Sequence, residues 1–184
     1  MMADDPNDAD RRRALRSLAG WSLLGALSLG ACSVEAPAKL RPGDQFPRFL
    51  LPDMGGQMHD SRSYEGRPLL LNFWATWCPP CRNEMADLNS LQQALAPKGL
   101  VLLAISIDRD LNLVREFIRR EGLTLIVLSD GDQQWSRSAL RIPELPASYL
   151  VGTDFRVREI VPGARRWADA PVQNTVATRL NLKP

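Results

Sequence analysis

The residues best suited to chemistry are two cysteines three positions apart, Cys78 and Cys81, in the stretch WCPPC. A thiolate attacks a disulfide, and a second thiol close by can then release the mixed disulfide that forms. A disulfide that closes so short a loop constrains the unfolded chain very little, so it is a poor structural staple. The spacing of the two cysteines therefore predicts a redox-active pair and thiol-disulfide exchange.

Two prolines, Pro79 and Pro80, separate the cysteines. The apolar run before Cys78 predicts a strand, and the apolar spacing after it predicts a helix, so the Cys78 sulfur is expected at the helix N-terminus. The helix dipole and the unpaired N–H groups there favour the thiolate. Proline is tolerated in a first helical turn, and it removes N–H donors that would otherwise reach the sulfur. We therefore expect a reducing couple, with a potential well below the value of about −120 mV that marks a strong oxidant.

Strand and helix patterns alternate along the rest of the chain, which predicts an α/β sandwich around a mixed sheet. The expected elements are a hairpin of strands at 49–51 and 57–59, a strand at 69–75, a helix at 79–95, a strand at 100–107, a helix at 111–120, a strand at 123–128, a weak helix at 132–140, a hairpin of strands at 148–151 and 155–161, and a helix at 169–180.

The N-terminal segment predicts export. Residues 1–31 join three arginines to an apolar stretch of 14 residues, which is too short to span a membrane because about 20 are needed. Leu29–Cys32 resembles the lipobox of bacterial lipoproteins, in which the cysteine is lipidated and becomes the first residue of the mature protein. The alternative is a plain signal peptide or an uncleaved anchor. We expect a signal peptide at 1–31, a tether at 32–40 and a domain at 41–184 outside the cytoplasm.

The composition argues against several other functions. The 184 residues carry a formal net charge of +2 and show no basic stripe, so no nucleic acid is expected. Arg165 and Arg166 beside Trp167 are interpreted as solvated surface. The domain has two cysteines and only His59 as a histidine, too few ligands for structural zinc, so no metal is expected. No cofactor is expected beyond the redox-active disulfide itself.

The segment NFWATWCPPC resembles the active site of the thioredoxin superfamily. Together with PGDQFPRFLLPD, FWATWCPPCRNE and ELPASYLV, in this order over about residues 40–180, it is similar to the membrane-tethered TlpA/ResA-type thiol-disulfide oxidoreductases. This resemblance implies a thioredoxin-like fold with a mixed central sheet, flanking helices and an N-terminal β-hairpin extension. It implies Cys78 as nucleophile, Cys81 as resolving cysteine, and Pro146 as a cis-proline that turns the Leu145 backbone toward the sulfurs.

Two further positions bear on the mechanism. Thioredoxins carry a buried aspartate where this chain has Asn72, whereas TlpA/ResA-type proteins have a glutamate where Glu84 stands. On a helix Glu84 shares a face with Cys81, where a carboxylate can take the proton of the resolving thiol. The alternative is a solvated surface glutamate. Trp74 is expected in the core, and the remaining aromatic residues give no functional signal. The expected substrate surface consists of Trp77, Pro79, Pro80, Leu145 and Pro146.

The resemblance also implies partners. The expected substrates are disulfide-containing exported proteins, such as apocytochrome c during cytochrome c maturation, and a membrane dithiol donor would re-reduce the protein. Lipidated Cys32 would hold it on the extracytoplasmic side of a bacterial membrane. General disulfide reduction or repair is the main alternative. A lipid-anchored scaffold with an idle disulfide is a second one. A peroxiredoxin is disfavoured, because its pattern needs a threonine where Ala75 stands.

Overall fold

The computed structural model describes residues 39–183. The predicted signal segment 1–31, the predicted lipidation site Cys32 and nearly all of the predicted tether 32–40 lie outside these residues. Between residues 39 and 183, no helix is both long enough and apolar enough to cross a membrane.

The described chain alternates strands and helices, as predicted. The strands are β1 (Leu50–Pro52), β2 (Met58–Asp60), β3 (Leu69–Trp74), β4 (Val101–Ser106), β5 (Ile126–Ser129), β6 (Ala147–Val151) and β7 (Val157–Pro162). The α-helices are α2 (Pro79–Leu95), α3 (Leu111–Glu121) and α4 (Ala170–Arg179), and the shorter turns are η1 (Ser61–Tyr64), η2 (Ala96–Lys98) and η3 (Trp135–Ala139). The weak helix predicted at 132–140 is instead a short π-helix, η3.

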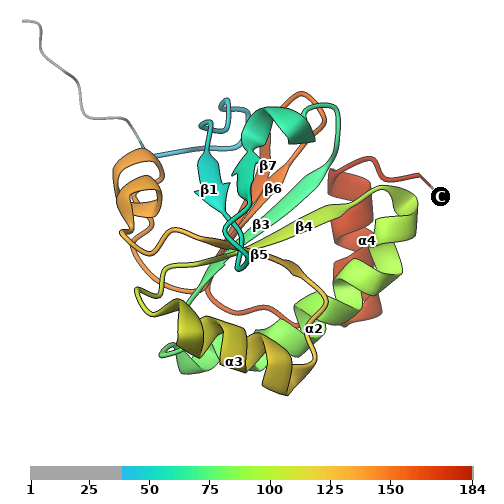
Figure 1. Cartoon of the computed structure of the whole chain (residues 1–184). Coiled ribbons are helices and arrows are strands. Elements are labelled where there is room, and N and C mark those ends of the chain that lie inside the picture. The colour runs from blue at the N-terminus through green and yellow to red at the C-terminus, as the bar shows by residue number, and fades with distance from the viewer. Residues whose placement is uncertain (1–38, 184) are drawn as a thin grey trace, which may run out of the picture. The chain divides into compact units, whose positions relative to one another are not determined.

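A five-stranded sheet in the order β5-β4-β3-β6-β7 forms the centre of the fold (Figure 1). β3 and β4 are parallel, as are β4 and β5, whereas β6 runs antiparallel to both of its neighbours. Every residue of β3 is buried, as expected for a strand covered on both faces. The C-terminal end of β3 leads into α2, so the cysteine pair lies at the carboxyl ends of the parallel strands, where α/β proteins place their sites. The predicted mixed α/β fold class is confirmed.

The helices α2, α3 and α4 lie together on one side of the sheet (Figure 1). Alternate strand residues point to opposite faces. Leu70 and Leu102 accordingly belong to the core under these helices, whereas Leu71 and Leu103 belong to the core on the other face. Both faces are therefore filled with apolar side chains, which fixes the position of β3 and of the loop that follows it.

The N-terminal hairpin covers the second face of the sheet. β1 and β2 pair antiparallel, and Phe49 just before β1 packs its ring 5.1 Å from that of Trp135 on η3. The hairpin turn contains Gly56 at φ +90°, a conformation that favours glycine. A backbone bridge between Asp53 and Leu128 joins the hairpin to β5, an edge strand of the main sheet. The predicted hairpin extension is confirmed, with each strand shifted by one residue.

Candidate active site

Cys78 is the N-cap of α2. Its backbone is extended, with φ −99° and ψ 103°, and its sulfur accepts a hydrogen bond from the Cys81 N–H at 3.4 Å. Pro79 and Pro80 occupy the first two helical positions, and proline has no N–H. The first helical turn therefore offers the Cys78 sulfur one N–H donor, that of Cys81. The two sulfurs are joined in a disulfide whose Cα atoms are 5.3 Å apart.

The two cysteines differ in access. Cys78 is 5% exposed and lines a cavity of about 700 Å³, whereas Cys81 is fully buried. A second disulfide that approaches through the cavity meets Cys78 first. This difference in access fits the assignment of Cys78 as the attacking cysteine and Cys81 as the resolving one.

The predicted substrate surface is only partly assembled around this cavity. Trp77, Pro79 and Leu145 line it, and Trp77 is 62% exposed. The Leu145–Pro146 peptide bond is cis, as the resemblance implies. Pro146 itself is buried, and Pro80 is exposed on α2, so neither belongs to the cavity lining.

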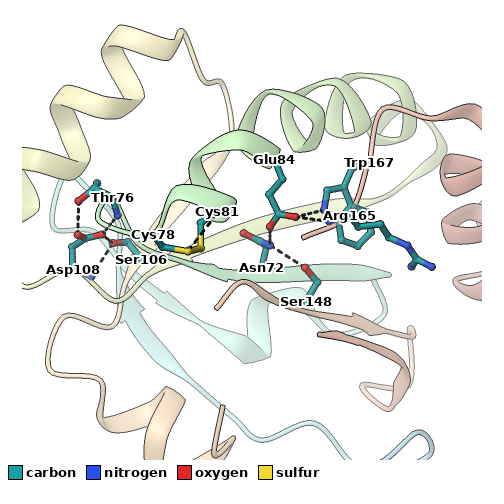
Figure 2. Close-up of a disulfide and its surroundings, with 10 residues drawn as sticks. All are labelled: Asn72, Thr76, Cys78, Cys81, Glu84, Ser106, Asp108, Ser148, Arg165 and Trp167. Atoms are coloured by element: carbon teal, nitrogen blue, oxygen red, sulfur yellow. Dashed lines mark hydrogen bonds between the residues drawn. A yellow bond between two sulfur atoms is a disulfide. The ribbon is translucent and has the colours of Figure 1, made fainter. Parts of the chain in front are cut away.

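Glu84 lies one turn beyond Cys81 on the buried face of α2 and is 3% exposed, so it is not a solvated surface glutamate. Its Oε1 accepts from Asn72 Nδ2 at 2.8 Å, and its Oε2 accepts from the Arg165 backbone N–H and the Trp167 indole N–H, each at 3.0 Å (Figure 2). Burial raises the pKa of Glu84, because desolvation outweighs the hydrogen bonds that favour the charged form. A raised pKa suits a carboxyl group to accept and release a proton.

Asn72 connects Glu84 to the strand that follows the cis-proline. Its Nδ2 also donates to Ser148 Oγ at 2.9 Å, while its buried Oδ1 has no hydrogen-bond partner. Glu84 thus brings a carboxylate from α2 to a position beside residue 72, where thioredoxins carry an aspartate. An aspartate at position 72 would place two carboxylates in contact.

The interpretation of Arg165 and Arg166 as solvated surface is wrong for Arg165, which is only partly exposed. Trp167 is fully buried, and the Arg165 guanidinium lies 5.6 Å from its ring centre and pairs with Glu159 at 3.1 Å. The side chain of Arg166 is 83% exposed, as expected. The sequence gives no local signal that Arg165 and Trp167 contact Glu84, because they lie 81 and 83 positions after Glu84 in the chain.

Asp108 is a second buried carboxylate near the disulfide, and the sequence interpretation missed it. It accepts from the Thr76 N–H at 2.9 Å, the Thr76 hydroxyl at 2.6 Å and the Ser106 hydroxyl at 2.8 Å (Figure 2). These bonds tie the loop between β3 and α2, which carries Trp77, to the end of β4. The available signal was a polar pair, Ser106 and Asp108, at the carboxyl end of a buried strand, where α/β proteins place functional side chains.

A CPPC disulfide at a helix N-terminus, with a cis-proline loop lining the same cavity, defines a thioredoxin-like dithiol site. The AhpC/TSA family matches residues 42–160. The thiol-disulfide oxidoreductase ResA of Geobacillus kaustophilus is 33% identical over 121 residues, which cover 66% of this chain and 69% of the relative. ResA of Bacillus thuringiensis strain Al Hakam is 31% identical over 125 residues, which cover 68% and 72%. The chain belongs to the AhpC/TSA family and to its ResA-type thiol-disulfide oxidoreductases.

Solved structures agree with this assignment. A putative thiol:disulfide interchange protein DsbE from Chlorobium tepidum has the same fold, with a TM-score of 0.70 at 24% identity over 77% of this chain and 99% of that one. A thioredoxin-family thiol:disulfide interchange protein from Chlorobium tepidum TLS superposes with a TM-score of 0.64 at 26% identity over 76% and 99%. The protein is a thioredoxin-like thiol-disulfide oxidoreductase.

Proposed function

We propose that the protein reduces disulfides in exported proteins, with apocytochrome c during cytochrome c maturation as the substrate implied by the sequence resemblance. One observation carries the proposal: Cys78 is the N-cap of α2 and lines the cavity, whereas Cys81 is fully buried. General disulfide reduction or repair uses the same chemistry on a wider range of substrates.

The reaction starts from the reduced pair. The Cys78 thiolate attacks one sulfur of the substrate disulfide, so that a Cys78–substrate bond forms and the substrate S–S bond breaks. The leaving sulfur departs as a thiolate and takes a proton from water. The N-terminus of α2 and the Cys81 N–H stabilise the attacking thiolate, and the missing N–H groups of Pro79 and Pro80 limit that stabilisation. A reducing couple is the expected result.

Cys81 completes the reaction. Its thiol loses a proton and attacks the Cys78 sulfur, which forms the Cys78–Cys81 disulfide and releases the second substrate thiolate. Two electrons have then moved from the dithiol to the substrate, and no bound cofactor is needed. Because Cys81 is fully buried, its proton needs an acceptor inside the protein. Glu84 on the same buried face of α2 takes this role, and Asn72, Arg165 and Trp167 position it.

The proposed setting is the extracytoplasmic side of a bacterial membrane, with lipidated Cys32 as the anchor and a membrane dithiol as the electron donor. The N-terminal sequence pattern supports export. One similar solved structure is a secreted disulfide oxidoreductase of Mycobacterium tuberculosis, 25% identical over 71% of this chain with a TM-score of 0.58. Metabolic labelling with a radioactive fatty acid tests the anchor, because a Cys32→Ser variant should incorporate no label.

Trapping of substrates on Cys78 tests the reaction. In a Cys81→Ala variant the mixed disulfide cannot be resolved, so partner proteins should remain attached to Cys78 and be identified by mass spectrometry after thiol quenching. The matched control is the Cys78→Ser, Cys81→Ala double variant, which should trap nothing. Recovery of the same partners by both variants would refute the mechanism. A Cys78→Ser protein that sustains the physiological process would favour the idle scaffold instead.

A further inference from the structure

The chain between β5 and β6 brings two arginines to the cavity beside Cys78. Arg137 on η3 and Arg141 just after η3 both line the cavity, and both are exposed. Neither forms an ion pair with a carboxylate within residues 39–183. The cavity therefore carries two guanidinium groups whose charge the described chain does not pair.

Arg137 is held in place by a short relay of hydrogen bonds. Its Nε donates to Gln133 Oε1 at 2.7 Å, and Gln133 Nε2 donates to the Ile107 carbonyl at 3.2 Å. The two terminal nitrogens of Arg137 have no hydrogen-bond partner among the described residues. A guanidinium fixed through its Nε presents the other two nitrogens as a fork, a shape that matches a carboxylate.

The backbone beneath these arginines is anchored. The carboxylate of Asp130 accepts the backbone N–H groups of Trp135 at 3.2 Å and Ser136 at 2.8 Å, and Leu140 is buried in the core. Arg141 has φ +49°, a left-handed conformation uncommon for residues other than glycine. The cavity wall is thus ordered before any ligand binds, which lowers the entropic cost of binding.

The rest of the lining defines what fits between Cys78 and the arginines. Half of the lining residues are apolar, namely Trp77, Pro79, Ile107, Ile142, Pro143 and Leu145, and Glu144 contributes the only carboxylate. With Arg137 and Arg141 the lining has two positive charges and one negative charge, a formal net charge of +1. An extended polypeptide with an acidic side chain near its disulfide satisfies both the apolar walls and the unpaired arginines.

We propose that this cavity selects disulfide substrates that carry an aspartate or glutamate close to the attacked cysteine, with Arg137 and Arg141 binding the carboxylate. The inference rests on the proposed reduction of protein disulfides and names a preference within it. The two arginines act as specificity determinants, while Glu144 opposes them.

Matched peptides test the preference. Three short synthetic peptides are closed by one disulfide and differ only beside the first cysteine, which is flanked by two aspartates, two asparagines or two lysines. The reduced full-length protein is mixed with each peptide, and the second-order rate constant of its oxidation is measured by acid quench and mass spectrometry. We expect the aspartate peptide to react about fivefold to tenfold faster than the asparagine peptide, and the lysine peptide to react slowest. The advantage should shrink at about 1 M salt, where the Debye length is about 3 Å.

Variants separate substrate selection from effects on the thiolate. Arg137→Gln and Arg141→Gln should each lower the aspartate-to-asparagine rate ratio by about threefold, and Glu144→Gln should raise it. Arg119→Gln is the matched control, because Arg119 is exposed on α3 away from the cavity lining. If the arginines only stabilise the Cys78 thiolate, their replacement changes all three rates by the same factor, and the inference is overturned.

The rates for the wild-type protein separate the acidic preference from the reductase function. Equal rates for the three peptides would overturn the acidic preference and leave the proposed reductase function in place. A protein that reduces none of the peptides would refute the reductase function, and the preference would be refuted with it.

Discussion

Two buried carboxylates lie on either side of the disulfide, Glu84 on α2 and Asp108 at the end of β4 (Figure 2). Each is 3% exposed, and each accepts three hydrogen bonds. Burial and the number of hydrogen bonds therefore do not distinguish them.

Their partners do. Asp108 binds the N–H and the hydroxyl of Thr76 and the hydroxyl of Ser106, so it fastens one loop to one strand end. Glu84 is bound by N–H donors from β3 and from the chain between β7 and α4, and it lies one turn from Cys81. The groups next to a buried carboxylate therefore decide its role. We infer that Asp108 is an anchor and that Glu84 is the proton acceptor.

The largest expected effect is on the resolving step. A Glu84→Gln variant keeps a similar shape but cannot accept a proton, so release of the substrate by Cys81 should slow about hundredfold, a typical contribution of general base catalysis. Formation of the mixed disulfide on Cys78 should change much less. Rapid acid quench followed by mass spectrometry measures both steps.

Glu116→Gln is the matched control for this experiment, because Glu116 is an exposed carboxylate on α3. It should leave both steps near the wild-type rates. If the Glu84→Gln protein resolves the mixed disulfide as fast as wild type, Glu84 is not the proton acceptor and does not differ in role from Asp108.

The next effect is on stability. An Asp108→Ala variant leaves the N–H and hydroxyl of Thr76 without their partner, so the free energy of unfolding should fall by about 2 kcal/mol. Urea unfolding of the oxidised protein measures this loss. A double-mutant cycle with Thr76→Val tests its cause, because the two changes should be strongly non-additive. Additive losses would show that Asp108 does not anchor the loop through Thr76.

Replacement of the amide beside Glu84 should have a smaller effect that depends on pH. In an Asn72→Asp variant a second carboxylate stands where the amide nitrogen now lies 2.8 Å from Glu84 Oε1. Two carboxylates this close share a proton, so we expect a loss of about 1 kcal/mol at neutral pH that shrinks toward acid pH. Ser148→Ala, which removes the other partner of the Asn72 amide without adding charge, should show a loss that does not change with pH. Equal pH dependence in both variants would contradict this expectation.

The smallest effect comes from the titration of Glu84 itself. Its pKa in the folded protein is raised above the ordinary value of 4.5. The stability that neutral Glu84 contributes is therefore complete below about pH 4.5 and is lost as the pH rises through the raised pKa. Glu84→Gln does not titrate, so the stability of the variant relative to wild type should increase from about pH 4.5 upward. Urea unfolding across this range measures the trend, and a constant difference would show that the pKa is not raised.

The sequence is sufficient to predict the elements whose signals are local. A nearly continuous apolar run predicts β3, and the helical spacing of Leu88 and Leu91 predicts α2. The resemblance adds the cis bond before Pro146. The boundaries of η3 could not be predicted, because Asp130 binds its first backbone N–H groups and the chain then closes a wider turn, in which the Leu140 N–H donates to the Trp135 carbonyl.

The site is less predictable than the fold, since its polar contacts join distant segments. The spacing of Glu84 from Cys81 predicts that both share a helix face, and burial confirms it. Trp167 gives no such signal, because its contact with Glu84 depends on how the chain before α4 packs against α2. Asp108 follows a buried strand, yet only the folded loop shows that Thr76 is its partner.

The bridge between Asp53 and Leu128 covers part of an exposed edge of the main sheet. β5 is an edge strand, and an unpaired edge invites the backbone of another molecule to extend the sheet into an aggregate. The hairpin occupies part of this edge. At the opposite edge, β7 carries Arg158 and Glu159 and ends in Pro162, residue types that discourage such stacking. Both edges of the sheet therefore carry features that discourage pairing between copies of the protein.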